Sequence, residues 1–265
     1  MPAPTMARRG LVALMNAVPA SAAARFPTTG RPARVLRPVV NALLPGAPTT
    51  VEVRAGAARG IRLRIDPRRE KFYWTGLYET GVQDVFERIL AAGDTVWDIG
   101  AHVGFFTALA ARCVGPTGRV HAFEPQPANR ARLEETVALN GLECVAVHAL
   151  ALAGQAGTMM LYGHGSTSMW SLVERPDVDS VPVTCTTLDD LAANGRFGVP
   201  RLVKIDAENT EIEILRSGRA LAESANVAFV VELGTGPEVE AAGDLLPNHG
   251  FRRLSARHWL LERRA

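Results

Sequence analysis

Short apolar runs alternate with longer segments of helical periodicity through the middle of the chain. β-branched and apolar residues predict buried strands at residues 95–99, 119–123, 144–149, 202–205 and 227–231. Helices are expected between the first three of these strands, at residues 105–113 and 127–139. The second helix ends at Asn140-Gly141. Strands that alternate with helices predict an α/β fold with a mostly parallel sheet.

Hairpins are expected on both sides of this alternating region. Residues 51–54 and 61–65 flank a glycine-containing turn and predict a hairpin, and a helix is expected at residues 80–90. Further strands are expected at residues 158–162, 181–186, 251–255 and 259–262. The last two strands should complete the sheet as a hairpin.

The strand at residues 95–99 carries an acid, Asp98, and leads into Gly100. A carboxylate at the carboxyl end of a central strand is costly unless it meets a partner, and ligands bind at that edge of open α/β sheets. Gly100 permits a tight turn and lets the backbone approach a ligand closely. The following helix would turn its amino end toward that ligand. These features predict a nucleotide-binding cleft.

Glu124 ends the next strand and follows Gly100 at about the 20-residue spacing at which an acid receives ribose hydroxyls. Such a carboxylate accepts both hydroxyls of an adenosine ribose. The G-x-G-x-x-G fingerprint of nicotinamide enzymes, which serves a pyrophosphate, is absent from residues 100–104. S-adenosylmethionine (SAM) has no pyrophosphate and is therefore favoured. A nicotinamide-dependent oxidoreductase, and an ordinary turn with a surface glutamate, stay open as alternatives.

Four motifs follow one another in order: Asp98 to Gly104 (DIGAHVG), Ala122 to Pro125 (AFEP), Thr187 to Leu191 (TLDDL) and Val203 to Asn209 (VKIDAEN). Together they resemble the FkbM family of class I SAM-dependent methyltransferases, from about residue 51 to about residue 234. The resemblance implies a Rossmann-like, mostly parallel sheet with a seven-stranded core and an N-terminal helical and hairpin extension. It implies SAM as cofactor, S-adenosylhomocysteine as product, and O-methylation of a hydroxyl on a sugar, glycan or secondary metabolite. A SAM-fold protein that binds without catalysing is the alternative.

Residues at the matching positions are expected to bind the cofactor: Glu79, Asp98, Gly100, Ala101, His102, Glu124 and Asp206. The chain departs from the family pattern twice, because the family usually has Asn in place of His102 and Gly in place of Asn209. Asn tolerates a positive φ better than most residues, so the second change is mild. We place His102 in the first turn of the helix that faces the cofactor. There it contacts the methionine part of SAM or the substrate, or it serves as a capping or supporting polar residue.

Methyl transfer to a hydroxyl needs in-line placement of the nucleophile and gains from a base. Asp206 and Glu208 follow a core strand within the most characteristic acidic motif of the family. We expect Asp206 to position SAM or the methyl acceptor, unless it caps the next helix, and Glu208 or His164 to act as base. Glu232 ends the strand at residues 227–231 and is a further candidate. These carboxylates suit Mg²⁺, but their spacing alone assigns no metal.

His164 belongs to a long connection, residues 163–179, that is rich in Ser, Gly and Pro and also contains Ser166, Ser168 and Trp170. Loops of this length are often functional. We expect this loop to form part of the methyl-acceptor site, and a mobile surface loop is the alternative.

Composition limits the class of partner. The chain of 265 residues can bury a substantial core, and its net charge of +2 carries no nucleic-acid signature. The expected partner is a small-molecule or glycan methyl acceptor. The three cysteines, Cys113, Cys144 and Cys185, are scattered, fit no zinc spacing and suit a reducing compartment. Because SAM is an intracellular cofactor, a cytoplasmic location is expected.

We divide the chain into a basic N-terminal helical arm (1–50), a hairpin and helix that lead into the core (51–92) and the SAM-binding domain (93–265). No acidic residue precedes Glu52. Arg8-Arg9 and the following apolar run imitate a secretory signal, but Asn16 and Pro19 interrupt that run. Amphipathic helices that contact a partner or an anionic membrane surface are the favoured interpretation, beside a partly ordered extension. The oligomeric state stays open.

Overall fold

The computed structural model describes residues 48–164, 170–224, 226–234 and 236–264. Almost all of the basic arm expected at residues 1–50 therefore lies outside the described residues, as do Ser166 and Ser168. Within the described ranges, no helix combines the length and the apolar character needed to cross a membrane.

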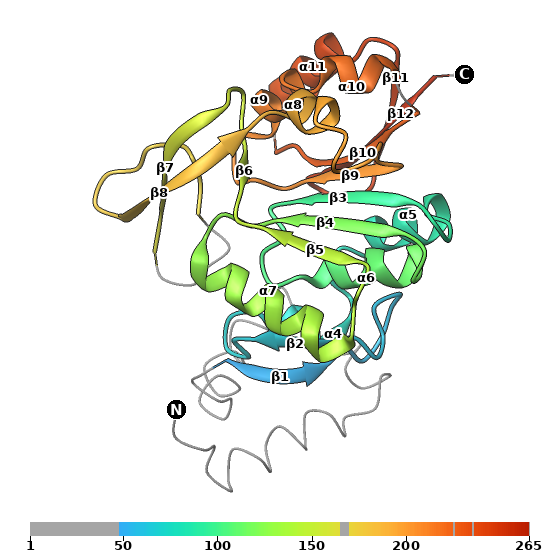
Figure 1. The fold of residues 1–265 in the computed structure, drawn as a ribbon, viewed down its shortest axis with the longest axis vertical. Helices are drawn as coiled ribbons and strands as arrows, with labels where there is room; N and C mark the ends of the chain where they lie inside the picture. The colour runs from blue at the N-terminus through green and yellow to red at the C-terminus, as the bar shows by residue number, and fades with distance from the viewer. Residues whose placement is uncertain (1–47, 165–169, 225, 235, 265) are drawn as a thin grey trace, which may run out of the picture.

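A seven-stranded sheet forms the centre of the molecule (Figure 1). Its strands, in chain order, are β3 (Thr95–Ile99), β4 (Arg119–Phe123), β5 (Val145–His148), β9 (Leu202–Ile205), β10 (Ala228–Glu232), β11 (His249–Arg253) and β12 (His258–Arg263). Their spatial order is β11-β12-β10-β9-β3-β4-β5, with β12 antiparallel to both of its neighbours and the remaining pairs parallel. The predicted Rossmann-like, mostly parallel sheet of seven strands is confirmed.

Alternating side chains of the central strands supply two apolar layers, one on each face of the sheet. Val96 and Leu202 pack in the layer that also contains the buried sides of α5 (Thr80–Ile89) and α6 (Phe105–Val114). Trp97 and Val203 pack in the opposite layer. That layer is covered by α8 (Leu188–Ala193), α9 (Glu211–Arg216), α10 (Arg219–Ser224) and α11 (Gly236–Leu245). Burial on both faces explains why these strands read as continuous apolar runs.

The strand order reverses between β3 and β9, which are neighbours in the sheet. From β3 the chain proceeds outward through β4 to β5, whereas from β9 it proceeds outward through β10. Crossovers to opposite sides leave a crevice beyond the carboxyl ends of the strands at such a point. The ends of β3, β4, β9 and β10 are therefore the places where a ligand is expected.

The segment before the sheet forms an antiparallel hairpin, β1 (Thr49–Glu52) and β2 (Arg62–Ile65), followed by α4 (Lys71–Thr75). The hairpin packs against α7 (Pro127–Asn140). Arg132 of α7 forms a buried ion pair with Glu70 and donates hydrogen bonds to the Arg64 carbonyl oxygen. This link fixes α4 and its aromatic residues beside the carboxyl end of the sheet.

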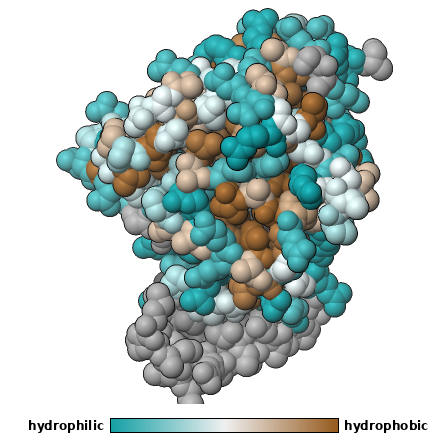
Figure 2. Space-filling view, viewed as in Figure 1, coloured by the Kyte–Doolittle hydropathy of each residue, from teal (hydrophilic) through white to brown (hydrophobic). Residues whose placement is uncertain are grey.

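A small second sheet projects from the molecule at the carboxyl end of the central sheet (Figure 1). It contains β6 (Ala151–Leu152), β7 (Gly157–Gly163) and β8 (Asp179–Thr186), with β8 antiparallel to β7 and parallel to β6. Figure 2, which shows the molecule from the same side as Figure 1, has a strip of apolar residues in the middle of this face, between hydrophilic borders.

Candidate functional site

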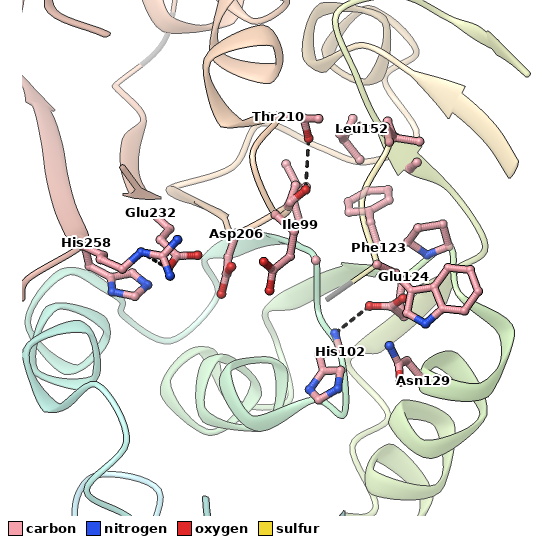
Figure 3. A pocket seen from close by; sticks show the side chains of 18 of the residues that line it. Ile99, His102, Phe123, Glu124, Asn129, Leu152, Asp206, Thr210, Glu232 and His258 are labelled. Carbon is pink, nitrogen blue, oxygen red and sulfur yellow. Dashed lines mark hydrogen bonds and ion pairs between the residues drawn. The ribbon is translucent and has the colours of Figure 1, made fainter. Parts of the chain in front are cut away.

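A cavity of about 440 Å³ lies at the carboxyl ends of the central strands, where the strand order reverses. One part, which we call the nucleotide half, is lined by Phe123, Glu124, Pro125, Asn129, Leu150 and Ala151. The other part, the acidic half, is lined by Glu79, Asp206, Glu208, Glu232 and His258. Figure 3 shows Glu124 on one side of Asp206, and Glu232 with His258 on the other.

Gly100 forms the turn between β3 and α6 and lies directly against the end of β9. Its φ is +73°, and a Cβ atom there would lie 1.8 Å from the Asp206 carbonyl oxygen. The backbone N–H of Gly100 and that of Ala101 both donate to the Phe123 carbonyl oxygen at 3.1 Å. Close backbone packing therefore requires glycine at this position and holds Glu124 and Asp206 on either side of the turn.

Glu124 is buried, and both of its carboxylate oxygens accept backbone hydrogen bonds. Oε2 accepts from the His102 N–H and Oε1 from the Gln126 N–H, each at 2.9 Å. A carboxylate oxygen has a second lone pair, so each can still accept a ribose hydroxyl. Burial raises the pKa of Glu124 to about 7, although the two backbone donors favour the charged form.

His102 lies in the turn before α6, which begins at Phe105, and not in the first helical turn where the sequence had placed it. Its φ of +50° and the left-handed Gly104 exclude a helical start at this point. The ring lines the cavity and its Nδ1 lies 3.2 Å from the Tyr73 hydroxyl oxygen. Burial, reinforced by the nearby Arg132, lowers the pKa of His102 to about 3, so the ring is neutral at pH 7.

Lys204 lies buried between two acids. Its Nζ is 3.6 Å from Asp98 Oδ1 and 3.3 Å from Asp206 Oδ2. Burial works against the ammonium, but the charges of Asp206 and Asp98 outweigh it and raise the pKa of Lys204 well above its usual range. Burial likewise opposes the Asp206 carboxylate, and Lys204 reverses that effect, so the pKa of Asp206 is lowered. Asp206 is therefore ionised at neutral pH.

Asp98 lies behind the cavity and does not line it. Its side chain is fully buried, accepts a hydrogen bond from the Thr107 hydroxyl and faces Lys204. Ala101 is also absent from the described cavity lining. Their predicted cofactor contacts stay predictions, and in this structure Asp98 acts on the cavity through Lys204.

Glu208 and Asn209 extend the turn after β9 with φ values of +56° and +79°. The left-handed conformation expected at Asn209 is therefore present, and Glu208 shares it. Burial raises the pKa of Glu208 to about 7, and the Asp206 charge adds to the shift. Thr210 occupies the N-cap position of α9, and the Asp206 side chain contacts Lys204, so the structure does not support the helix-capping alternative for Asp206.

Glu79, Glu232 and His258 complete the acidic half from three different elements. Burial raises the pKa of Glu79 to about 7. Burial and the neighbouring Asp206 charge raise the pKa of Glu232, which also pairs with Arg257. Burial lowers the pKa of His258 to about 4. A carboxylate-rich chamber of this kind can hold hydroxyl groups, cations or both.

His164 does not join this group. It is exposed at the end of β7 and does not line the cavity. Trp170, from the same predicted loop, does line it together with Leu161 and Leu172. Sequence reasoning missed His258 and Tyr73, because β12 and α4 meet the cavity through the fold and no motif marks these residues. Lys204 was visible as one of two lysines in the chain, inside the acidic motif.

Known structures share features with this chain at low sequence identity. A methyltransferase FkbM from Methylobacillus flagellatus is 14% identical, with a TM-score of 0.47 over 69% of this chain and 51% of that one. The chain thus spans about half the length of that protein. A SAM-dependent O-methyltransferase from Thermotoga maritima is 13% identical, with a TM-score of 0.43 over 71% and 65%. A putative rRNA methylase from Clostridium thermocellum is 15% identical, with a TM-score of 0.44 over 69% and 95%.

No curated protein matches the sequence. A family model, described as the methyltransferase FkbM domain, matches residues 98–253. The match begins at Asp98 and ends with β11, so it covers the central sheet from the end of β3 through β11 but not β12. It includes Glu124, Asp206, Glu208 and Glu232. The chain belongs to the FkbM family of methyltransferases.

Proposed function

We propose that the protein transfers the methyl group of SAM to a hydroxyl of a sugar, a glycan or a secondary metabolite. The observation that carries the proposal is the pairing of the two halves of one cavity. A ribose-binding carboxylate, Glu124, lies in one half, and a group of partly buried carboxylates lies in the other. The methyl group of SAM would lie between them.

The nucleotide half suits adenosine. Glu124 keeps lone pairs for two ribose hydroxyls, and the apolar side chains of Phe123, Leu150 and Ala151 offer surfaces against which a base can pack. Asn129 supplies an amide at the edge of the same half.

The acidic half suits a polyhydroxylated methyl acceptor, because carboxylate oxygens accept hydrogen bonds from hydroxyl groups. Glu208 is the favoured base. It lines the cavity with a pKa raised to about 7, which is close to the value at which a general base works best near neutral pH. Asp206, held as a carboxylate by Lys204, is the group that positions SAM or the methyl acceptor.

The reaction forms one bond and breaks another. The hydroxyl oxygen of the methyl acceptor forms a bond to the methyl carbon, and the carbon–sulfur bond of the sulfonium breaks to give the neutral thioether S-adenosylhomocysteine. The hydroxyl proton passes to the Glu208 carboxylate and from there to solvent. The main contribution of the protein is the in-line placement of the two reactants in a cavity.

The test is transfer of labelled methyl from SAM to a panel of polyhydroxylated acceptors, each paired with a form in which the hydroxyls are blocked. Glu208→Gln should lower kcat by about 10²–10⁴-fold, because the variant cannot take the proton, and should leave SAM affinity within a few-fold of the parent. Glu213→Gln is the matched control, since Glu213 is an exposed acid on the neighbouring helix α9.

Equal labelling of an acceptor and of its hydroxyl-blocked form would contradict the O-methylation proposal. Wild-type turnover in both Asp206→Asn and Glu208→Gln would show that the assigned site is wrong. Tight SAM binding without transfer to any acceptor would instead favour a non-catalytic binding protein.

A further inference from the structure

The acidic half holds three metal-ligating side chains that the fold brings together. Asp206 follows β9, Glu232 ends β10 and His258 begins β12. Glu232 and His258 are direct partners across the antiparallel β10–β12 pair, so their side chains project from the same face. One potential ligand atom from each of the three residues lies within 4.8 Å of the other two.

His258 provides an independent reason to expect a ligand here. The residue is 3% exposed, and its Nδ1 lies 3.1 Å from the Ser255 hydroxyl. That hydroxyl oxygen accepts hydrogen bonds from the backbone N–H groups of Arg257 and His258, which hold it beside the ring. The other ring nitrogen, Nε2, is buried and makes no hydrogen bond with any described residue.

An oxygen of Glu79, close to this nitrogen, also lacks a hydrogen-bond partner among the described residues. His258 Nε2 lies 3.2 Å from Glu79 Oε2, and neither atom has a hydrogen-bond partner among the described residues. Buried polar atoms without partners are rare in proteins, and a bound ion can satisfy them. Metal binding through Nε2 uses the tautomer in which Nδ1 carries the ring proton and Nε2 presents its lone pair to the carboxylates, as in many metal-binding histidines.

The neighbouring cations leave room for an ion. Lys204 contacts Oδ2 of Asp206, and Arg257 contacts Oε1 of Glu232. Each carboxylate therefore has a second oxygen that these cations do not contact. All three residues line the cavity, so further coordination positions would face its interior (Figure 3).

We propose that Asp206, Glu232 and His258 bind a divalent transition-metal ion whose remaining coordination positions face the acidic half. One imidazole nitrogen with two carboxylates favours Mn²⁺, Fe²⁺ or Zn²⁺ over Mg²⁺ and Ca²⁺, which prefer oxygen ligands alone. Glu79 is placed to contribute a fourth ligand. The ion would hold an oxygen of the methyl acceptor and stabilise its deprotonated form. That role depends on the proposed function, whereas the metal binding does not.

The experiment uses the full chain, freed of metal with a chelator that is then removed by dialysis, and titrates it with Mn²⁺ alone. Calorimetry should give one site per chain, and the electron paramagnetic resonance signal of free Mn²⁺ should fall in proportion. His258→Gln and Glu232→Gln should each weaken Mn²⁺ binding at least tenfold. His249→Gln is the matched control, because His249 is equally buried on the neighbouring strand β11 but lies outside the cavity.

Thermal unfolding separates loss of a ligand from loss of the fold. Mn²⁺ should raise the Tm of the wild-type protein and of His249→Gln, and should not raise that of His258→Gln. Absence of Mn²⁺ binding, or Mn²⁺ binding that persists in both site variants, would overturn the metal site.

Methyl-transfer assays test the role of the ion in catalysis separately from metal binding. Unchanged methyl transfer after chelation would overturn the role of the ion in holding the methyl acceptor. Mn²⁺ binding without transfer to any hydroxyl acceptor would overturn the proposed function and leave the metal site standing.

Discussion

At the residue scale, the cavity is controlled by carboxylates whose environments differ. Glu124 is buried and accepts two backbone hydrogen bonds, whereas Asp206 lies against the Lys204 ammonium. Burial raises the pKa of Glu124 and of Glu208 to about 7, whereas Lys204 lowers that of Asp206. These different environments match the roles that we propose, which are ribose binding for Glu124, proton transfer for Glu208 and positioning for Asp206.

The pKa of Glu124 predicts a pH-dependent cofactor affinity. As the pH falls from 8 to 5.5, the carboxylate becomes protonated below about pH 7 and loses acceptor capacity for the ribose hydroxyls. SAM affinity should fall by at most about tenfold per pH unit for this one proton. Glu124→Gln should bind SAM more weakly at pH 8 and lack this part of the fall. Calorimetric titrations across the range measure both, and identical profiles for the two proteins would contradict the assignment.

At the element scale, the turn after β3 contacts the ends of two other strands, β4 and β9. Gly100 fits against the Asp206 carbonyl oxygen after β9, while its N–H donates to the Phe123 carbonyl oxygen at the end of β4. The sequence could predict this turn, because a glycine that follows a buried strand in this motif has a specific steric reason. It could not predict that Asp98 does not line the cavity, since its burial against Lys204 depends on the adjacent strand.

Gly100→Ala should destabilise the fold much more than a glycine change in open space. Gly141 has a comparable φ of +60°, and no atom lies within 4 Å of the position that an alanine methyl group would take there. Gly141→Ala should therefore lose about 1–2 kcal/mol from backbone strain alone. Gly100→Ala adds a clash with backbone and should lose at least twice as much. Chemical denaturation measures both losses, and equal losses would show that the close contact with Asp206 is not needed.

The hairpin and α4 are attached to the core by a buried ion pair. Arg132→Met leaves the Glu70 carboxylate buried without its partner, which typically costs about 3–5 kcal/mol of the free energy of unfolding. The double variant Arg132→Met with Glu70→Leu should recover part of that loss, because no unpaired charge remains. A double variant that is less stable than Arg132→Met would contradict this account, as measured by denaturant unfolding.

At the scale of the whole molecule, the acidic half is assembled from segments that are distant in sequence. Strand positions and the order of the motifs were predictable, because apolar runs and the resemblance mark β3, β4, β9 and β10. Glu79 and Glu232 were named from their places near those motifs. His258 and Tyr73 were not, since their proximity arises from the antiparallel β12 and from the docking of α4, and no local pattern encodes either. His164 was named from the composition of its loop, and no local pattern showed that the fold would leave it outside the cavity lining.

The central claim is that this cavity binds SAM through Glu124, and calorimetric titration tests it most directly. SAM, S-adenosylhomocysteine and NAD are titrated into the wild-type protein, into Glu124→Ala and into Glu134→Ala, a control at an exposed acid on α7. SAM and S-adenosylhomocysteine should bind the wild type and the control, and should bind Glu124→Ala about 10–100-fold more weakly, since hydrogen bonds to a charged group are lost. Binding of NAD but not SAM, or equal SAM binding by Glu124→Ala, would contradict the account.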